Sequence, residues 1–156
     1  MIKKGALVLN LSKNFKFNYP SIKFTSFVFS GGEEHIKIEE DEFINKTERF
    51  IIASNMANSS DLMKIFLATD VLKTINNNAK IELFSPYFPY ARQDRRMTYG
   101  EPFSIKVITN IINNQKYDKV HVFDPHSDIT TALIDNINVI DNFNFVKLSW
   151  NDIKKK

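Results

Sequence analysis

The amino-acid sequence predicts an α/β fold, in which a mostly parallel, twisted sheet carries flanking helices and a β-hairpin appendage. Two observations predict it. From residue 49 onward, apolar strand patterns alternate with amphipathic helix patterns, which is typical of parallel sheets with right-handed crossovers. Before residue 49, two strand-like segments flank a Ser-Gly-Gly-Glu turn, which favours an antiparallel hairpin.

The segment before residue 49 is expected to form one strand and the hairpin. Residues 6–9 are apolar and indicate a short strand. Residues 23–29 and 34–40 are the expected arms of the hairpin, and both glycines of the turn at 30–33 are expected to adopt positive φ angles. Polar residues alternate with isoleucines along the second arm, so one face of the hairpin should be exposed to solvent.

The segment after residue 49 begins with a strand at 49–54, whose apolar run suits a strand covered on both faces. A helix is predicted at 61–75, capped by Ser59 or Ser60, and a strand at 81–85. The apolar stripe of this helix is Leu62, Ile65, Phe66, Thr69, Leu72 and Ile75.

The last predicted elements follow a second helix pattern. Pro102 is placed at the first helical position, and a strand is expected at 119–123. A helical turn is expected at 130–133 and a brief strand at 139–140. The apolar stripe of the second helix is predicted to be Phe103, Val107, Ile108, Ile111 and Ile112.

The composition is that of one ordinary globular domain, assigned to residues 1–156. Hydrophobic residues make up 43% of the chain and charged residues 25%, and there is no cysteine. These features favour a reducing, cytoplasmic location. The chain shows no signal-peptide or membrane-span pattern. The net charge is +3, and the lysines are scattered along the sequence rather than clustered. Nucleic-acid binding is therefore a minor alternative, which predicts salt-sensitive binding to any DNA.

An arginine-rich segment follows the strand at 81–85. A turn rich in proline and aromatic residues leads into Arg92, Gln93, Asp94, Arg95 and Arg96. Arginine matches phosphate oxygens two at a time, so a strand ending in such a loop predicts a polyphosphate site. Gln93 can serve phosphate or a ribose, and Asp94 can brace an arginine. The alternative is a solvated basic loop with local ion pairs.

A second polar loop follows the strand at 119–123. Asp124, His126 and Asp128 alternate along it and, if the loop is extended, project to one side as an oxygen and nitrogen site. The alternative is a hydrogen-bonded loop anchor. Because parallel strands end at one edge of a sheet, this loop and the arginine loop are expected to converge there.

Several other residues favour structural roles. His121 lies in an apolar strand and is interpreted as a core residue, whereas His35 is expected at the surface. The aromatic runs at 15–19 and 24–29 are expected to pack rather than to bind. Taken alone, the Gly-Gly turn is interpreted as a structural turn without a binding role.

Together these segments resemble ribose-phosphate pyrophosphokinase, also called PRPP synthetase. The family pattern is a Phe-Ser-Asp-Gly-Glu hairpin, a Pro-Tyr-x-x-Tyr-Ala-Arg-Gln-Asp-Arg loop, a Glu/Val-Pro-Ile/Phe helix start and an Asp-Leu-His-Ala/Ser loop. Order and spacing agree from about Phe27 to Leu133. The matching runs are Phe29 to Glu33, Pro86 to Arg95, Glu101 to Phe103 and Asp124 to Ser127.

The resemblance implies magnesium-dependent transfer of the diphosphate of ATP to ribose 5-phosphate. It implies that Arg92, Gln93 and Arg95 hold the ATP phosphates and ribose, and Asp94 is placed in the same ATP-binding set. His126 would lie at the Mg²⁺ and phosphate side, with Asp124 in support. Phe29 and Glu33 would reach the adenine of a neighbouring subunit in a homo-oligomer, and Gly31 lies between them in the ATP-binding set.

The sequence departs from the family pattern in two respects that bear on activity. Gly31 stands where the family has aspartate, so one adenine contact is lost. No glycine follows Gly100, so the C-terminal phosphoribosyl-binding half of the family, with its Gly-rich loop, is expected to be absent, and ribose 5-phosphate would bind only if such a half exists. The chain is therefore expected to bind nucleotide but to be inactive alone. The alternative is a catalytically dead regulatory or assembly module of the same ancestry.

Overall fold

A computed structural model describes residues 5–143, and its framework is a five-stranded sheet whose neighbouring strands all pair in parallel. The strand order is β1-β4-β5-β6-β7. The strands are β1 (Leu7–Asn10), β4 (Arg49–Ala53), β5 (Lys80–Ser85), β6 (Lys119–Phe123) and β7 (Ile137–Ile140). The parallel sheet expected from the alternation of strands and helices is confirmed.

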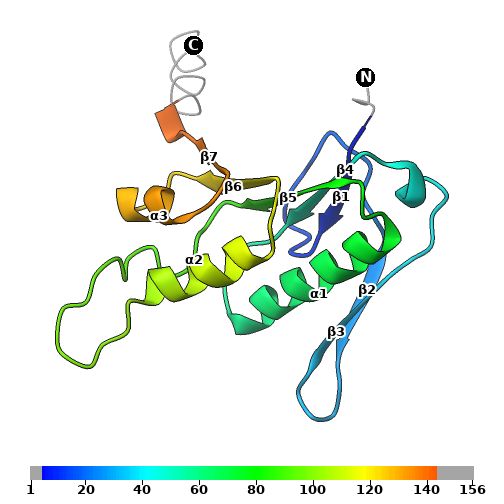
Figure 1. Ribbon diagram of the computed structural model, residues 1–156. Coiled ribbons are helices and arrows are strands. Elements are labelled where there is room, and N and C mark those ends of the chain that lie inside the picture. Colours follow the sequence, from blue (N-terminus) through cyan, green and yellow to red (C-terminus); the bar gives the residue numbers. More distant parts are fainter. Residues whose placement is uncertain (1–4, 144–156) are drawn as a thin grey trace, which may run out of the picture.

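Two helices cover one face of this sheet. Helix α1 (Ser59–Ile75) connects β4 to β5, and α2 (Ser104–Asn114) connects β5 to β6. Figure 1 shows both helices on the same side of the sheet, as two successive right-handed crossovers in one direction require. A short helix, α3 (Asp128–Leu133), follows β6, and a single 3₁₀ turn, η1 (Ile44–Lys46), precedes β4.

The main core lies between the sheet and these helices. Leu83 of β5 and Val122 of β6 are fully buried, as are Ile65 of α1 and Ile112 of α2. A smaller cluster forms on the opposite face, where Phe15 meets Phe84 edge-on with ring centroids 5.5 Å apart. The packing role predicted for the aromatic run at 15–19 is therefore confirmed.

The hairpin consists of β2 (Phe24–Val28) and β3 (Glu34–Ile38), which pair antiparallel. It projects past α1, with its tip away from the sheet (Figure 1). In its turn only Gly32 adopts a positive φ, of 95°. The expectation that both glycines do so was wrong, because the Gly32 amide already closes the turn on the Phe29 carbonyl at 2.9 Å.

The starts of both main helices differ from the sequence prediction. Asn58, not Ser59 or Ser60, caps α1: its side chain accepts a hydrogen bond from the Asp61 amide at 2.9 Å. Helix α2 begins at Ser104 rather than at Pro102, and Phe103 precedes it without a side-chain cap.

The buried face of α2 also differs from the predicted stripe. Ile105, Thr109 and Ile112 are buried, whereas Val107 is 52% exposed and Ile111 is 38% exposed. Isoleucine and valine occur on more than one side of this helix, so periodicity alone did not determine which side meets the sheet. The stripe predicted for α1 is confirmed at Ile65, Thr69 and Leu72, which are all buried.

Two histidines have surroundings that their sequence patterns do not reveal. His121 lies on the second face of the sheet, where its Nε2 is 2.8 Å from Glu82 Oε2 and its Nδ1 is 3.0 Å from Asn138 Nδ2. It is thus a structural residue, as interpreted, but with polar partners. His35 is half-buried rather than at the surface, because its ring packs against Phe27 of the adjacent strand, with centroids 4.9 Å apart.

We expect the Tyr117→Phe variant to lower the free energy of unfolding by about 1 kcal/mol, since it removes one buried hydrogen bond. The Tyr117 hydroxyl lies 2.8 Å from Thr69 Oγ1, and Thr69 Oγ1 donates to the Ile65 carbonyl at 2.7 Å, so the Thr69 proton keeps its acceptor in the variant. Urea unfolding measures the effect. Tyr99→Phe, at a fully exposed site, is the control, and equal midpoints for both variants would contradict the expectation.

Candidate functional site

The loops that follow β5 and β6 meet at the carboxyl edge of the sheet, because these two strands are adjacent and parallel. Residues 86–103 form the first loop, here called the arginine loop, and residues 124–127 form the second, the acid–histidine loop. Two cavities adjoin there, of about 530 and 370 Å³. Arg92 and His126 line both cavities, so the expected convergence of the loops is confirmed.

The arginine loop is held by buried residues at its start. Phe88 and Ala91 are 2% and 6% exposed, and the Ser85 hydroxyl donates to the Tyr87 carbonyl at 2.5 Å. Tyr90 then adopts a positive φ of 60°, and its carbonyl accepts from the Gln93 amide at 2.9 Å. This tight turn leaves the Arg92 and Gln93 side chains exposed at the larger cavity.

Asp94 connects the two loops. Its Oδ1 accepts from Arg95 Nε at 3.1 Å, and the Ser127 hydroxyl is close enough to the same carboxylate to affect its pKa. The Arg95 hydrogen bond first, and the Ser127 hydroxyl second, lower the pKa of Asp94 below its ordinary 3.8. The structure therefore gives Asp94 the bracing role that was one of its two predicted roles. Nothing in the sequence pointed to Ser127 as a partner, because 33 positions separate the two residues.

Glu101 shapes the far end of the arginine loop. Its Oε2 accepts from the backbone amides of Met97 at 3.0 Å and Thr98 at 3.1 Å. These hydrogen bonds lower the pKa of Glu101, with the Met97 amide as the larger cause. The connection closes a short turn in which Gly100 adopts a φ of 89° and Tyr99 is fully exposed.

The acid–histidine loop does not gather its three polar residues. Asp124 has a positive φ of 42°, and its amide donates to the Ile140 carbonyl at 3.1 Å, whereas Asp128 already belongs to α3. Within residues 5–143 no three acidic or histidine side chains lie close enough to share a metal ion. The prediction of one Asp124–His126–Asp128 site was wrong, because the backbone bend and the helix separate them. Asp124 and His126 still line the smaller cavity together.

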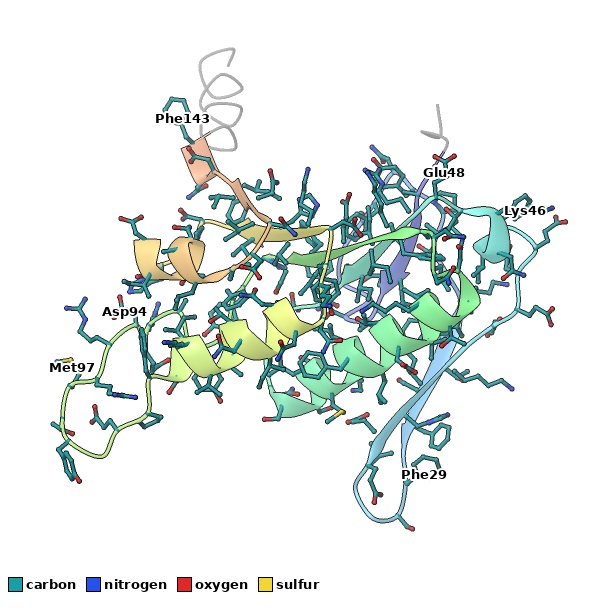
Figure 2. The ribbon with its side chains drawn as sticks, in the orientation of Figure 1. Phe29, Lys46, Glu48, Asp94, Met97 and Phe143 are labelled. Carbon is teal, nitrogen blue, oxygen red and sulfur yellow. The ribbon has the colours of Figure 1, made fainter. Side chains whose placement is uncertain are left out.

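The hairpin residues lie apart from these loops. Figure 2 shows Phe29 at the hairpin tip and Asp94 and Met97 at the opposite end of the described structure. Phe27 and Phe29 are 48% and 49% exposed, so the packing role expected for this end of the second aromatic run was wrong. Their rings meet edge-on, with centroids 5.0 Å apart.

Gly31 makes room for a neighbouring carboxylate in the hairpin turn. A β-carbon at position 31 would lie 2.5 Å from Glu33 Oε2, closer than van der Waals contact allows. The Glu33 side chain therefore folds back over the turn in a way that any larger residue at position 31 would change.

These features define the class of the protein: a parallel α/β domain whose candidate ligand site lies beyond the carboxyl ends of β5 and β6. Residues 6–115 match the model of the N-terminal domain of ribose phosphate pyrophosphokinase, and the chain belongs to this family. Within the described residues, helices that have both the length and the apolar character to cross a bilayer are absent.

Individual relatives agree with this assignment. The chain is 34% identical to a ribose-phosphate pyrophosphokinase of Mycoplasma genitalium. The matched region covers 85% of this chain and 39% of that protein. It is 37% identical to a ribose-phosphate pyrophosphokinase of Campylobacter jejuni over 80% of its length and 42% of that protein. The chain thus spans about two fifths of the length of these relatives.

A solved structure resembles the whole described fold. The crystal structure of phosphoribosylpyrophosphate synthetase from Mycobacterium smegmatis matches with a TM-score of 0.75 at 18% identity, over 96% of this chain and 52% of that chain. This likeness confirms the fold predicted from the sequence.

We expect Asp94→Asn to loosen the connection between the two loops while leaving the sheet intact, because a neutral amide attracts the Ser127 hydroxyl less strongly than a carboxylate does. Amide hydrogen exchange should accelerate in residues 92–96 and 126–128. Asp70→Asn, on the exposed side of α1, is the control for charge. Unchanged exchange in both segments would show that Asp94 does not hold the loops together.

Acid should have the same effect as this substitution. A carboxyl whose folded pKa lies below its unfolded value stabilises the fold above the unfolded value, and that contribution is lost as pH falls through the folded pKa. For Asp94 the ordinary value is 3.8, so the loops should stay connected at pH 5 and separate as pH falls below about 4. The chemical shift of the Ser127 amide, followed against pH, measures this separation of the loops. A transition midpoint above pH 5 would contradict the prediction.

Proposed function

We propose that this chain is the ATP-binding half of a ribose-phosphate pyrophosphokinase, which transfers the diphosphate group of ATP to ribose 5-phosphate in nucleotide biosynthesis. One observation carries the proposal: Arg92 and His126 line both cavities at the meeting point of the two loops. Adjoining cavities that share a guanidinium and an imidazole suit an extended anion such as triphosphate. The family of the chain supports the same ligand.

The residues of the arginine loop divide into two roles in this proposal. Arg92, Gln93 and Arg95 contact ATP: the guanidinium groups bind phosphate oxygens, and the amide of Gln93 binds a phosphate or the ribose. Asp94 acts through Arg95, because its carboxylate is already engaged by that guanidinium and by Ser127. Diphosphoryl transfer requires mainly positioning and neutralisation of charge, which is what these side chains provide.

Magnesium is the cofactor that we propose for this site, and the donor set is compatible with it. Mg²⁺ takes one or two carboxylates together with substrate phosphates and water, so the exposed Asp124 carboxylate beside Arg92 suffices as a protein ligand. His126 borders the same cavity and would contact the ion or the phosphates. The bound ion would neutralise phosphate charge during transfer.

The acceptor side of the reaction requires more than this chain. The chain spans about two fifths of the length of its relatives, and its last glycine is Gly100. Residues 101–156 contain no glycine, so a Gly-rich loop that presents consecutive amides to a sugar phosphate does not lie among them. We propose that the isolated chain binds nucleotide and does not turn over ribose 5-phosphate.

The hairpin is proposed to act on a second copy of the chain. Phe29 and Asp94 lie at opposite ends of the described structure, so one molecule cannot close both on the same nucleotide (Figure 2). In a homo-oligomer, the Phe29 ring would stack on the adenine held by the partner, and the Glu33 carboxylate would accept a hydrogen bond from the adenine amino group. Recognition of the adenine would thus depend on formation of the homo-oligomer.

Arg92→Ala is expected to weaken the binding of Mg²⁺–ATP by roughly ten- to a hundredfold, because it removes one charge-assisted contact to phosphate. Isothermal titration calorimetry measures the dissociation constant. Arg96→Ala is the matched control, since it removes the same charge from a neighbouring residue that lines neither cavity. Equal losses for the two variants would indicate general electrostatic attraction rather than a site.

A second candidate is a catalytically dead assembly module, and one observation favours it. Gly31 replaces the aspartate of the family pattern and leaves Glu33 as the one acidic side chain of the turn at residues 30–33. Such a module would join a full-length synthetase without binding ATP. Size-exclusion chromatography of the mixture tests it: co-elution without ATP binding by the chain supports the module, and ATP binding without co-elution supports the first proposal.

A further inference from the structure

The hairpin is fastened to helix α1 by a polar contact centred on Glu34, the first residue of β3. The Ser60 hydroxyl of α1 donates to Glu34 Oε1, and Lys64 Nζ lies 3.7 Å from Glu34 Oε2. The Glu34 side chain is only 11% exposed, so both contacts form in a largely water-excluded setting. We call the three residues the Glu34 clamp.

The clamp is the part of the hairpin–helix contact nearest the tip. Glu34 pairs with Val28 across the hairpin, and the turn follows directly. Beyond that pair the hairpin is solvated, since Val28 is 55% exposed and Phe29 is 49% exposed. The next anchor is Ile36, two residues farther from the tip and 4% exposed. The direction of the tip relative to α1 is therefore set at Glu34.

The chemistry of the clamp makes it depend on the Glu34 charge. Ser60 lies in the first turn of a seventeen-residue helix, where a carboxylate is favoured by the unpaired amides. Glu34 Oε2 is buried and makes no hydrogen bond within the described residues, so the attraction of Lys64 is its compensation. A neutral amide at this position would lose that attraction and keep the cost of burial.

The same contact decides which face of the hairpin is presented outward. Successive residues of a strand point to opposite faces, so with Glu34 held against α1, His35 must point away from it. The His35 ring lies 5.3 Å from that of Phe29 and so supports it from that outer face. A hairpin turned about its axis would not offer Phe29 in the same direction.

We propose that Glu34 is a positioning residue, which fixes the hairpin tip so that Phe29 and Glu33 can meet the base of a nucleotide held by a second copy of the chain. The last part rests on the proposed function; the clamp itself does not. Glu34 touches no substrate in this proposal. It acts through the angle of the hairpin, and it should therefore affect ligands that carry a base and not ligands that carry phosphates alone.

The first test is amide hydrogen exchange in the intact chain with the variants Glu34→Gln and Ser60→Ala. We expect exchange of the Phe29 and Gly32 amides, which close the turn, to accelerate roughly tenfold in both, with β4 to β6 unchanged. Ser60→Thr keeps the hydroxyl and should restore protection. Glu39→Gln, an exposed charge change on the same hairpin, should have no effect. Equal exchange in the Glu34 and Glu39 variants, or acceleration throughout the sheet, would overturn the proposal.

The second test compares two ligands by calorimetry. Mg²⁺–ATP carries a base, and Mg²⁺–tripolyphosphate presents only the phosphates. Glu34→Gln should weaken ATP binding several-fold and leave tripolyphosphate binding unchanged, whereas Arg92→Ala should weaken both. Equal weakening of both ligands by Glu34→Gln would overturn a positioning role. If the wild-type chain binds neither ligand, the proposed function fails, and hydrogen exchange alone decides whether the clamp holds the tip.

Discussion

The parallel pairing of β5 with β6 is the constraint on which the candidate site depends. In register, Ser85 at the end of β5 is paired with Val122 near the end of β6, so both chains leave the sheet at nearly the same height. An antiparallel neighbour would have sent one loop to the far edge. Both residues are fully buried, which ties this register to the core. The site therefore inherits its geometry from apolar packing rather than from its own polar contacts.

Polar contacts then refine what the sheet brings together. Asp94 joins the arginine loop to the acid–histidine loop, and its lowered pKa keeps the carboxylate ionised at more acidic pH than an ordinary aspartate. Glu101 performs a similar task within the arginine loop. At the other end of the molecule, Glu34 fastens the hairpin to α1. Each of these acidic residues orders a segment whose cationic or aromatic side chains face solvent, which suits ligand recognition by loops on a rigid frame.

Local sequence signals predicted much of the fold and located the arginine loop. The alternation of strand and helix patterns predicted the parallel arrangement of β4, β5 and β6, short apolar segments indicated β1 and β7, and the run around Arg92 pointed to phosphate. Predictions failed where two local solutions were nearly equal. Asn58, Ser59 and Ser60 can all cap a helix, and apolar residues lie on more than one side of α2, so local pattern alone did not decide the cap or the buried face. The pairing of Asp94 with Ser127 had no local signal at all.

The sequence by itself determined the elements, their order and the residue types at the site, because apolar periodicity, turn glycines and arginine chemistry are local properties of the chain. Tertiary structure alone decided which polar groups meet. It separated Asp128 from Asp124 by placing it in α3, and it set Glu34 against α1. Such contacts join residues distant in sequence, and their energy depends on the burial and direction of side chains, which only the folded sheet fixes.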